Sequence, residues 1–263
     1  MMEEIEQLAQ LIIESQNVIA FTGAGISTES GIPDFRSPGG IWSRYDPEDF
    51  TIQKFLSGPA ARKTIWKMSL EGGLLTQAEP NLAHFAIAEL HRLGKLDCVI
   101  TQNIDYLHQK AGVPEDKVFE LHGNMRWVVC LNCRRRFPMP EVLQKVKDGV
   151  EIPDCPDCQG ILKPDAVFFG EALPQETLQE AIRRAQNCDL LIAIGSTLVI
   201  YPAAYIPTYA AEAGAKLAIV NLTPTPFDHY ATVVIRDKAG ETMCEVMERV
   251  RLFYLSGSGY TGC

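Results

Sequence analysis

The sequence lacks an excess of positive charge and lacks a signal for export. Its 24 Lys and Arg residues stand against 33 Asp and Glu, which leaves a formal net charge of −9. Sequence-independent binding to nucleic acid depends on clustered basic side chains, so this balance argues against it. The first residues, MMEEIEQLAQLII, are acidic where a secretory signal would be basic. We therefore expect a cytoplasmic protein that does not bind nucleic acid.

The sequence also lacks an uninterrupted hydrophobic run of membrane-spanning length. Its most apolar stretch, residues 190–207, is long enough, but it contains Gly195-Ser196-Thr197 and the prolines Pro202 and Pro207. These residues indicate a strand, a glycine turn and the start of a helix. We expect no membrane association, and without a coiled-coil repeat we expect a monomer.

Several short apolar runs end in small or polar residues. The runs are Val18–Thr22, Leu96–Thr101, Val118–Leu121, Leu190–Ile194 and Leu217–Val220. Between some of them lie stretches with helical spacing, such as Ile5–Ile13 and residues 81–93. Strands that are buried on both faces have this pattern, so we expect an α/β fold with a parallel sheet covered by helices. Ligands of such sheets bind at the carboxyl ends of the strands.

Two regions interrupt this alternation. Residues 36–80 carry Pro and Gly turns and mixed helical pieces, and residues 126–163 carry two cysteine pairs and several prolines. We interpret them as a helical insertion and a metal-binding insertion that together form a smaller domain. The large domain then comprises 1–35, 81–125 and 164–254, and the Gly/Ser-rich residues 255–263 form a flexible tail.

The cysteine pairs are the strongest chemical signal. Cys130 and Cys133, like Cys155 and Cys158, are separated by two residues, and 21 residues separate the pairs. Two such pairs can supply the four thiolates of a tetrahedral zinc site, with no coordination position left for chemistry. We predict one structural zinc ion; the alternative is two unrelated reducible pairs.

A glycine turn, Gly23-Ala24-Gly25, follows the first predicted strand. Such turns bring backbone N–H groups to a dinucleotide pyrophosphate, although many are plain tight turns. The sequence departs from G-x-G-x-x-G because Thr28 stands at the third glycine position. The turn alone therefore leaves both interpretations open.

Seven motifs together resemble one family. In chain order they are Gly23-Ala24-Gly25-Ile26-Ser27, Ser30-Gly31-Ile32-Pro33-Asp34-Phe35-Arg36, Thr101-Gln102-Asn103-Ile104-Asp105, His122-Gly123-Asn124, the paired cysteines, Phe168-Phe169-Gly170-Glu171 and Gly195-Ser196-Thr197. The chain resembles the sirtuins, NAD-dependent protein lysine deacylases, from about residue 4 to residue 250. The resemblance implies a Rossmann-like large domain, a zinc-ribbon small domain, and a cleft between them that holds NAD and an acetyl-lysine protein or peptide.

The resemblance also implies a reaction. The acyl oxygen attacks the nicotinamide ribose, nicotinamide leaves, and the acetyl group passes to ADP-ribose, giving O-acetyl-ADP-ribose and free lysine. His122 is then the general base, a role that suits the pKa of an imidazole. His122 follows a predicted strand, whereas we assign His84, His91, His108 and His229 structural roles.

The same resemblance assigns the remaining site residues. Asn103 orders the ribose or a water in catalysis, and Asp105 binds the carboxamide of nicotinamide; an Asx-rich turn is the alternative. The cofactor contacts are Ala24, Thr28, Phe35, Arg36, Gln102, Ile104, Asp105, Ser196, Thr197, Asn221 and Ala239. Val167, Phe168 and Phe169 form the tunnel for the acyl-lysine, although one of the two rings can equally be ordinary core.

Three further expectations concern specificity and alternatives. Desuccinylating sirtuins carry a Tyr and an Arg where Ser69 and Gly72 stand here, so we expect acetyl and other uncharged acyl groups as substrates. An ADP-ribosyltransferase or NAD glycohydrolase would use the same cofactor without a base at His122. A non-enzymatic zinc-ribbon adaptor would need no His122 at all.

Overall fold

The computed structural model describes residues 1–35, 37–70 and 78–257. Its larger part is built on a six-stranded parallel sheet of order β3-β2-β1-β7-β8-β9. The strands are β1 Val18–Thr22, β2 Leu96–Thr101, β3 Val118–Glu120, β7 Leu190–Ile194, β8 Lys216–Val220 and β9 Val233–Ile235. This confirms the α/β fold and the five predicted strands. Strand β9 is an additional edge strand, and its three residues are too few to show a recognisable pattern in the sequence.

The central strands separate two hydrophobic cores. In β1, Val18 and Ala20 belong to one core, whereas Ile19 and Phe21 belong to the other. All five residues of β1 and of β7 are buried, because successive side chains of a strand point to opposite faces. The uninterrupted apolar runs in the sequence are a consequence of this double burial.

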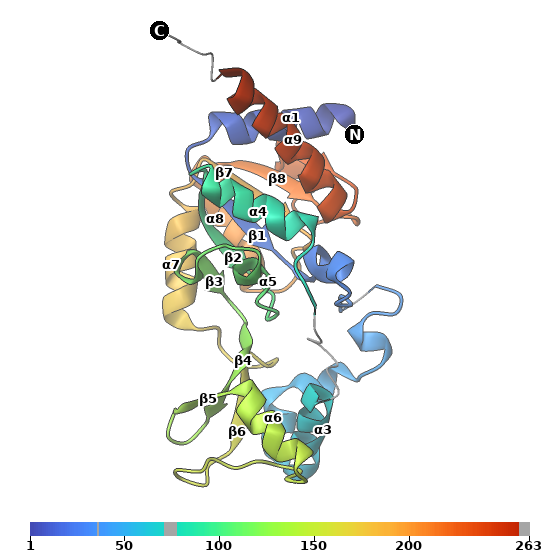
Figure 1. Ribbon diagram of the computed structural model, residues 1–263, viewed down its shortest axis with the longest axis vertical. Helices are drawn as coiled ribbons and strands as arrows, with labels where there is room; N and C mark the ends of the chain where they lie inside the picture. The colour runs from blue at the N-terminus through green and yellow to red at the C-terminus, as the bar shows by residue number, and fades with distance from the viewer. Residues whose placement is uncertain (36, 71–77, 258–263) are drawn as a thin grey trace.

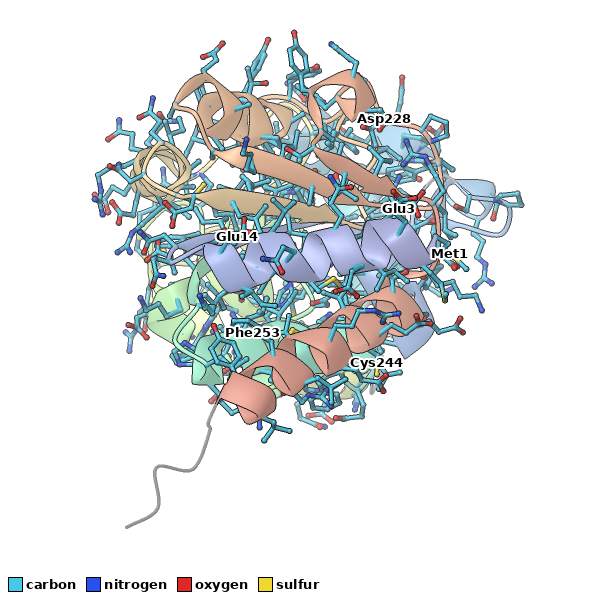
Figure 2. All side chains as sticks on the ribbon, turned by 90° about the horizontal axis from the view of Figure 1, so that it is seen from above. Met1, Glu3, Glu14, Asp228, Cys244 and Phe253 are labelled. Carbon is cyan, nitrogen blue, oxygen red and sulfur yellow. The ribbon has the colours of Figure 1, made fainter. Side chains whose placement is uncertain are left out.

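Helices cover each face of the sheet. The core on one face includes α1 Met2–Glu14, α4 Leu82–Arg92 and α9 Ala239–Gly257, and Figure 2 shows α1 and α9 lying side by side. The other core includes α7 Gln175–Ala185 and α8 Ile206–Glu212. Helix α9 continues to Gly257, where the sequence predicts a flexible tail from residue 255; residues 258–263 lie outside the described part of the chain.

A smaller module lies at the opposite end of the molecule from helices α1 and α9 (Figure 1). Its antiparallel sheet has the order β5-β4-β6, with β5 Arg136–Pro138, β4 Gly123–Cys130 and β6 Leu162–Ala166. Helices α2 Ile52–Ser57, α3 Pro59–Leu70 and α6 Met139–Lys147 complete it. Trp66 of α3 is fully buried against Val128 and Met139, so the two insertions share one core.

Short elements connect these parts. They are α5 Leu107–Lys110 and the 3-10 helices η1 Ala24–Ser30, η2 Ile41–Ser43, η3 Pro47–Phe50, η4 Glu115–Lys117, η5 Ala203–Tyr205 and η6 Asp228–Tyr230. Strand β4 leads from the large sheet into the small module, so the boundary expected after residue 125 falls inside it. Within the described residues, no helix combines the length and apolarity that crossing a membrane requires.

Candidate active site and metal centre

A cavity of about 760 Å³ opens at the carboxyl ends of β1, β2, β7 and β8 and extends toward the small module. Its volume falls in the range of small-molecule and cofactor sites. The structure brings together nearly all of the predicted residues there: Ala24, Thr28, Phe35, Gln102, Asn103, Ile104, Asp105, His122, Val167, Phe168, Phe169, Ser196, Thr197, Asn221 and Ala239 line it. Arg36 and Gly72 lie outside the described residues.

The glycine turn after β1 packs against the turn after β7. A Cβ at Gly23 would lie 2.9 Å from the Gly195 carbonyl oxygen, and one at Gly25 would lie 2.8 Å from Gly195 Cα. The Gly25 N–H also donates to the Gly195 carbonyl at 2.8 Å. These glycines are therefore required by backbone packing, and the chain then forms the 3-10 helix η1 rather than an α-helix.

The loop after β2 places three polar side chains in the cavity wall. Gln102 Nε2 donates to Ser196 Oγ at 2.8 Å, and Asn103 Nδ2 donates to the Gly23 carbonyl at 3.2 Å. Asp105 accepts hydrogen bonds from Ser27 Oγ at 2.7 Å and from the Leu107 N–H at 3.0 Å. Burial raises the pKa of Asp105, and these donors act against that shift. The loop thus joins the ends of β1, β2 and β7 at one point.

His122 occupies the same edge of the sheet, two residues after β3. Its Nδ1 lies 2.8 Å from the Gln102 carbonyl oxygen, which can only accept, so Nδ1 carries the proton and Nε2 is the basic nitrogen. Burial lowers the pKa of His122, and the hydrogen bond to Gln102 opposes this shift. A neutral imidazole with a defined basic nitrogen is what a general base requires.

The two phenylalanines of the predicted tunnel have different environments. Phe168 is buried and packs edge-on against Phe55 with 5.3 Å between ring centroids, so it is also part of a separate hydrophobic cluster with Phe55 and Ile65 of the small module. Phe169 is 44% exposed and lies 5.9 Å from the Trp42 ring, which also contacts Phe35 at 5.1 Å. Phe35, Trp42 and Phe169 therefore form an aromatic wall on one side of the cavity.

Lys163 is a functional candidate that the sequence analysis missed. Its side chain is 4% exposed, and its ammonium group donates to the carbonyls of Ala166 at 2.6 Å and Pro164 at 3.0 Å. It also pairs with Glu171 at 3.0 Å and lies 4.4 Å above the Phe168 ring. Burial lowers the pKa of Lys163, and Glu171 opposes that shift. The sequence carried no clear signal for it, because strand β6, with the sequence LKPDA, contains two charged residues and a proline.

The cavity also has an apolar end inside the small module, which the sequence did not indicate. Five of its lining residues come from α3, β4 and α6: Ile65, Met68, Met125, Met139 and Leu143. Ser69 lines the same region, and its hydroxyl donates to the Ile65 carbonyl at 2.9 Å. This end of the cavity suits an uncharged, flexible ligand group.

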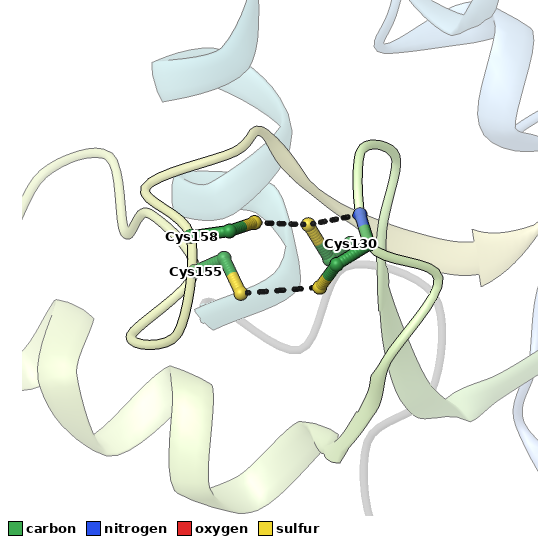
Figure 3. Close-up of side chains that lie close together, drawn as sticks. Cys130, Cys155 and Cys158 are labelled. Carbon is green, nitrogen blue, oxygen red and sulfur yellow. Dashed lines mark hydrogen bonds between the residues drawn. The ribbon is translucent and has the colours of Figure 1, made fainter.

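The four paired cysteines converge at the edge of the small module. Their sulfur atoms all lie within 4.8 Å of one another, with Cys130 and Cys158 3.6 Å apart and Cys133 and Cys155 3.8 Å apart (Figure 3). A tetrahedral zinc site with Zn–S bonds of about 2.3 Å has sulfur atoms about 3.8 Å apart, so the cluster fits one zinc ion. Gly160 leaves room for it, since a Cβ there would lie 3.0 Å from Cys130 Sγ.

The sequence is similar to one protein family over most of its length. The profile of the Sir2 family matches residues 23–202. NAD-dependent protein deacylase 2 of Archaeoglobus fulgidus is 47% identical over 253 residues, which is 95% of this chain and 98% of the relative. NAD-dependent protein deacetylase 1 of Pyrobaculum aerophilum is 45% identical over 250 residues, covering 95% of this chain and 96% of the relative.

Solved structures show the same similarity in three dimensions. A Sir2 enzyme studied for its mechanism and regulation superposes with a TM-score of 0.88 at 46% identity, covering 96% of this chain and all of the other. A Sir2 structure with a deacetylated p53 peptide and 3′-O-acetyl-ADP-ribose has a TM-score of 0.86 at 43% identity, with 93% and 97% covered. A third, with a myristoylated histone peptide, has a TM-score of 0.80 at 41% identity, with 97% and 100% covered.

Proposed function

Because the chain belongs to the Sir2 family, we propose that it is an NAD-dependent protein lysine deacetylase whose general base is His122. The observation that carries the proposal is the position of His122 in one cavity with Asn103, Asp105 and the apolar residues Val167 and Phe168. A basic nitrogen, a polar nucleotide region and an apolar tunnel are the three parts that this reaction needs.

NAD supplies the bond to nicotinamide and the ADP-ribose that accepts the acetyl group. The residues that fit it are the polar groups at the strand ends, because the cavity crosses the turn after β1 and reaches Asn221 after β8. Asp105 binds the carboxamide of nicotinamide, and Asn103 orders the ribose. Ser196, Thr197 and Asn221 contact the adenosine end; the Asn221 amide N–H donates to the Thr223 carbonyl, which leaves its oxygen as an acceptor for a ribose hydroxyl.

His122 acts through Nε2. Because Nδ1–H is held by the Gln102 carbonyl, Nε2 has its lone pair available to take a proton from a ribose hydroxyl. The lowered pKa favours the unprotonated form of this nitrogen. We therefore expect the rate to fall with decreasing pH at a lower pH than it would for a histidine of ordinary pKa.

The acyl-lysine enters between the aromatic wall and Val167. An uncharged acyl-lysine loses little on leaving water, whereas a charged lysine loses its hydration, so substrate enters and product leaves. The peptide adds as a strand between Gly170-Glu171 and residues 198–201, where main-chain hydrogen bonds recognise it with little dependence on side chains.

The decisive measurement is nicotinamide release from NAD with and without an acetyl-lysine peptide. We expect release that depends on the peptide and that yields an equal amount of O-acetyl-ADP-ribose. His122→Ala should lower this rate by at least about a hundredfold, the lower range for loss of a general base. His229→Ala, a change at an exposed histidine, is the matched control and should have no effect.

Three other outcomes would contradict the proposal. Release that ignores the peptide would indicate an NAD glycohydrolase, and label transferred from NAD to protein would indicate an ADP-ribosyltransferase. Absence of release from folded, zinc-loaded protein would leave the non-enzymatic adaptor.

The apolar end of the cavity extends the proposed substrate range to longer uncharged acyl chains. Its support is the lining by Met68, Met139 and Leu143, together with the myristoylated peptide bound by a relative of 41% identity. A succinyl group would bring an unpaired carboxylate into these surroundings, which is costly. Leu143→Trp, which fills this end, should therefore lower activity on decanoyl-lysine but spare acetyl-lysine. Comparable wild-type rates on succinyl- and acetyl-lysine would contradict the assignment.

We also propose that the enzyme is a cytoplasmic monomer that does not bind nucleic acid, and that the two insertions act as one small domain. The net charge of −9 argues against nucleic-acid binding, and the burial of Trp66 in one core with residues of the zinc insertion supports the single small domain. Light scattering of the purified protein tests the monomer.

A further inference from the structure

The peptide unit between Gln102 and Asn103 is held at both of its polar atoms. Its carbonyl accepts the hydrogen bond from His122 Nδ1, and its N–H donates to Thr101 Oγ1 at 3.0 Å. Because a peptide unit is planar, fixing the direction of the N–H also fixes the direction of the carbonyl. Whatever holds Thr101 Oγ1 therefore also orients the acceptor of His122.

A buried chain of hydrogen bonds leads away from Thr101. The Thr22 hydroxyl donates to Thr101 Oγ1 at 2.8 Å, and His108 Nε2 lies 2.9 Å from Thr22 Oγ1. Thr22, Thr101 and His108 are at most 2% exposed. None of the three lines the cavity, so they do not touch a ligand there.

His84 packs beside this chain and restricts its protonation. Its Nδ1 accepts from the Asn81 N–H at 3.4 Å, so its ring proton lies on Nε2. The ring centroids of His84 and His108 are 5.0 Å apart. Among the described atoms, neither His84 Nε2 nor His108 Nδ1 has a partner.

The Thr22 hydroxyl has one proton, which it donates to Thr101. His108 Nε2 therefore donates to Thr22, and His108 Nδ1 is an acceptor beside the protonated Nε2 of His84. Thr101 Oγ1 accepts from the Asn103 N–H at the same time, through its second lone pair.

We propose that His108, Thr22 and Thr101 are positioning residues that hold the Gln102–Asn103 peptide, so that His122 keeps its proton on Nδ1 and presents Nε2 to the substrate. This proposal rests on the proposed function, because it assigns these residues to His122 as general base. The side chain of Asn103 is positioned by the same peptide.

The test compares Thr101→Val, which removes the hydroxyl at nearly constant shape, with Thr101→Ser, which keeps it. We expect kcat for peptide-dependent nicotinamide release to fall at least about tenfold in Thr101→Val and to stay within about threefold of wild type in Thr101→Ser. The Kd for acetyl-lysine peptide should be unchanged in both. A merely structural role would move stability and binding together and would not follow the hydroxyl.

A second readout does not depend on activity. The ¹⁵N shifts of the His122 ring in ligand-free protein report its tautomer, and we expect protonated Nδ1 in wild type and Thr101→Ser but a mixture in Thr101→Val. If Thr101→Val does not fold, the same measurements are made on His108→Gln and His108→Leu. The glutamine amide retains a donor toward Thr22 and leucine does not, so we expect the larger loss in His108→Leu.

The positioning role would be overturned if folded Thr101→Val, or His108→Leu in its place, kept the wild-type kcat and the wild-type His122 tautomer. Failure of the proposed function is distinguishable, because it shows in the wild-type protein as absence of peptide-dependent release, before any variant is made.

Discussion

At the scale of single residues, burial gives chemically identical side chains different tasks. His122 lines the cavity with one nitrogen bonded to a carbonyl, whereas His84 and His108 are enclosed behind it. Burial lowers the pKa of all three, because it disfavours the charged imidazolium. Burial therefore favours the neutral form of all three histidines. Their position relative to the cavity decides which of them can act on a substrate.

The pair behind the cavity makes folding stability depend on pH. Burial lowers the pKa of His84 from 6.5 to about 4. Between these values the unfolded chain binds a proton that the folded chain does not, so the free energy of unfolding decreases as pH falls from about 6.5 to about 4. The loss from His84 is about 3 kcal/mol, at 1.36 kcal/mol for each pKa unit.

Urea unfolding at several pH values measures this dependence. His84→Gln should flatten the decrease between about pH 6.5 and pH 4. His229→Gln, at an exposed histidine, should leave it unchanged. An equally steep decrease in His84→Gln would mean that other groups cause the acid sensitivity.

At the scale of elements, the turn after β6 depends on a single buried ammonium group. Lys163 uses its three protons on two carbonyls and Glu171, while Glu171 also accepts from the Phe168 N–H at 2.7 Å. These contacts hold residues 166–171, which line the tunnel and follow it. Lys163 thus anchors the loop to strand β6, in addition to the backbone hydrogen bonds that join Phe169 to Phe50 and Ile52.

Lys163→Met should disorder the tunnel while leaving the nucleotide region intact. We expect KM for the acetyl-lysine peptide to rise at least about tenfold and stability to fall by about 2 kcal/mol, because the substitution removes the positive charge beside Glu171 and the donor to two carbonyls. The Kd for NAD should be unchanged. Lys216→Met, at the exposed start of β8, is the control. An unchanged peptide KM in Lys163→Met would show that the turn needs no such anchor.

At the scale of the whole molecule, the cavity belongs to two modules with separate cores. Its polar wall comes from the parallel sheet, and its apolar end comes from the module that the cysteines close. The small core includes Cys130 and Cys155 themselves, next to Trp66. A zinc ion at the cysteines would therefore stabilise the module that forms one wall of the cavity.

Zinc removal should abolish activity without removing the nucleotide region. With a strong chelator we expect loss of one zinc ion per chain, loss of peptide-dependent nicotinamide release, and a lower-temperature unfolding transition for the small module. Cys158→Ser should behave in the same way, whereas Cys244→Ser, at a cysteine of α9 outside the cluster, should not. Full activity of metal-free protein would contradict a structural role for zinc.

The sequence by itself determined the sheet, the zinc cluster and most of the cavity wall. Burial on both faces forces strands such as β1 and β7 to be apolar over most or all of their length, and zinc requires its four thiolates at short spacings. Parallel strands also bring their carboxyl ends to one edge, so residues as distant as Ala24, Asn103, His122 and Ser196 could be placed together before the structure was known.

Only the tertiary structure decided the contacts whose cause lies elsewhere in the chain. Strand β9 is too short to have a pattern. Lys163 bonds to backbone carbonyl groups, which every residue has, and His108 bonds to Thr22 from a distant segment. Neither kind of partner can be recognised from the sequence. The glycines of the turn after β1 are explained by Gly195, which lies 170 residues after Gly25 and approaches it only because β1 and β7 are neighbours. Local periodicity reports burial, whereas such long-range contacts exist only once the sheet has formed.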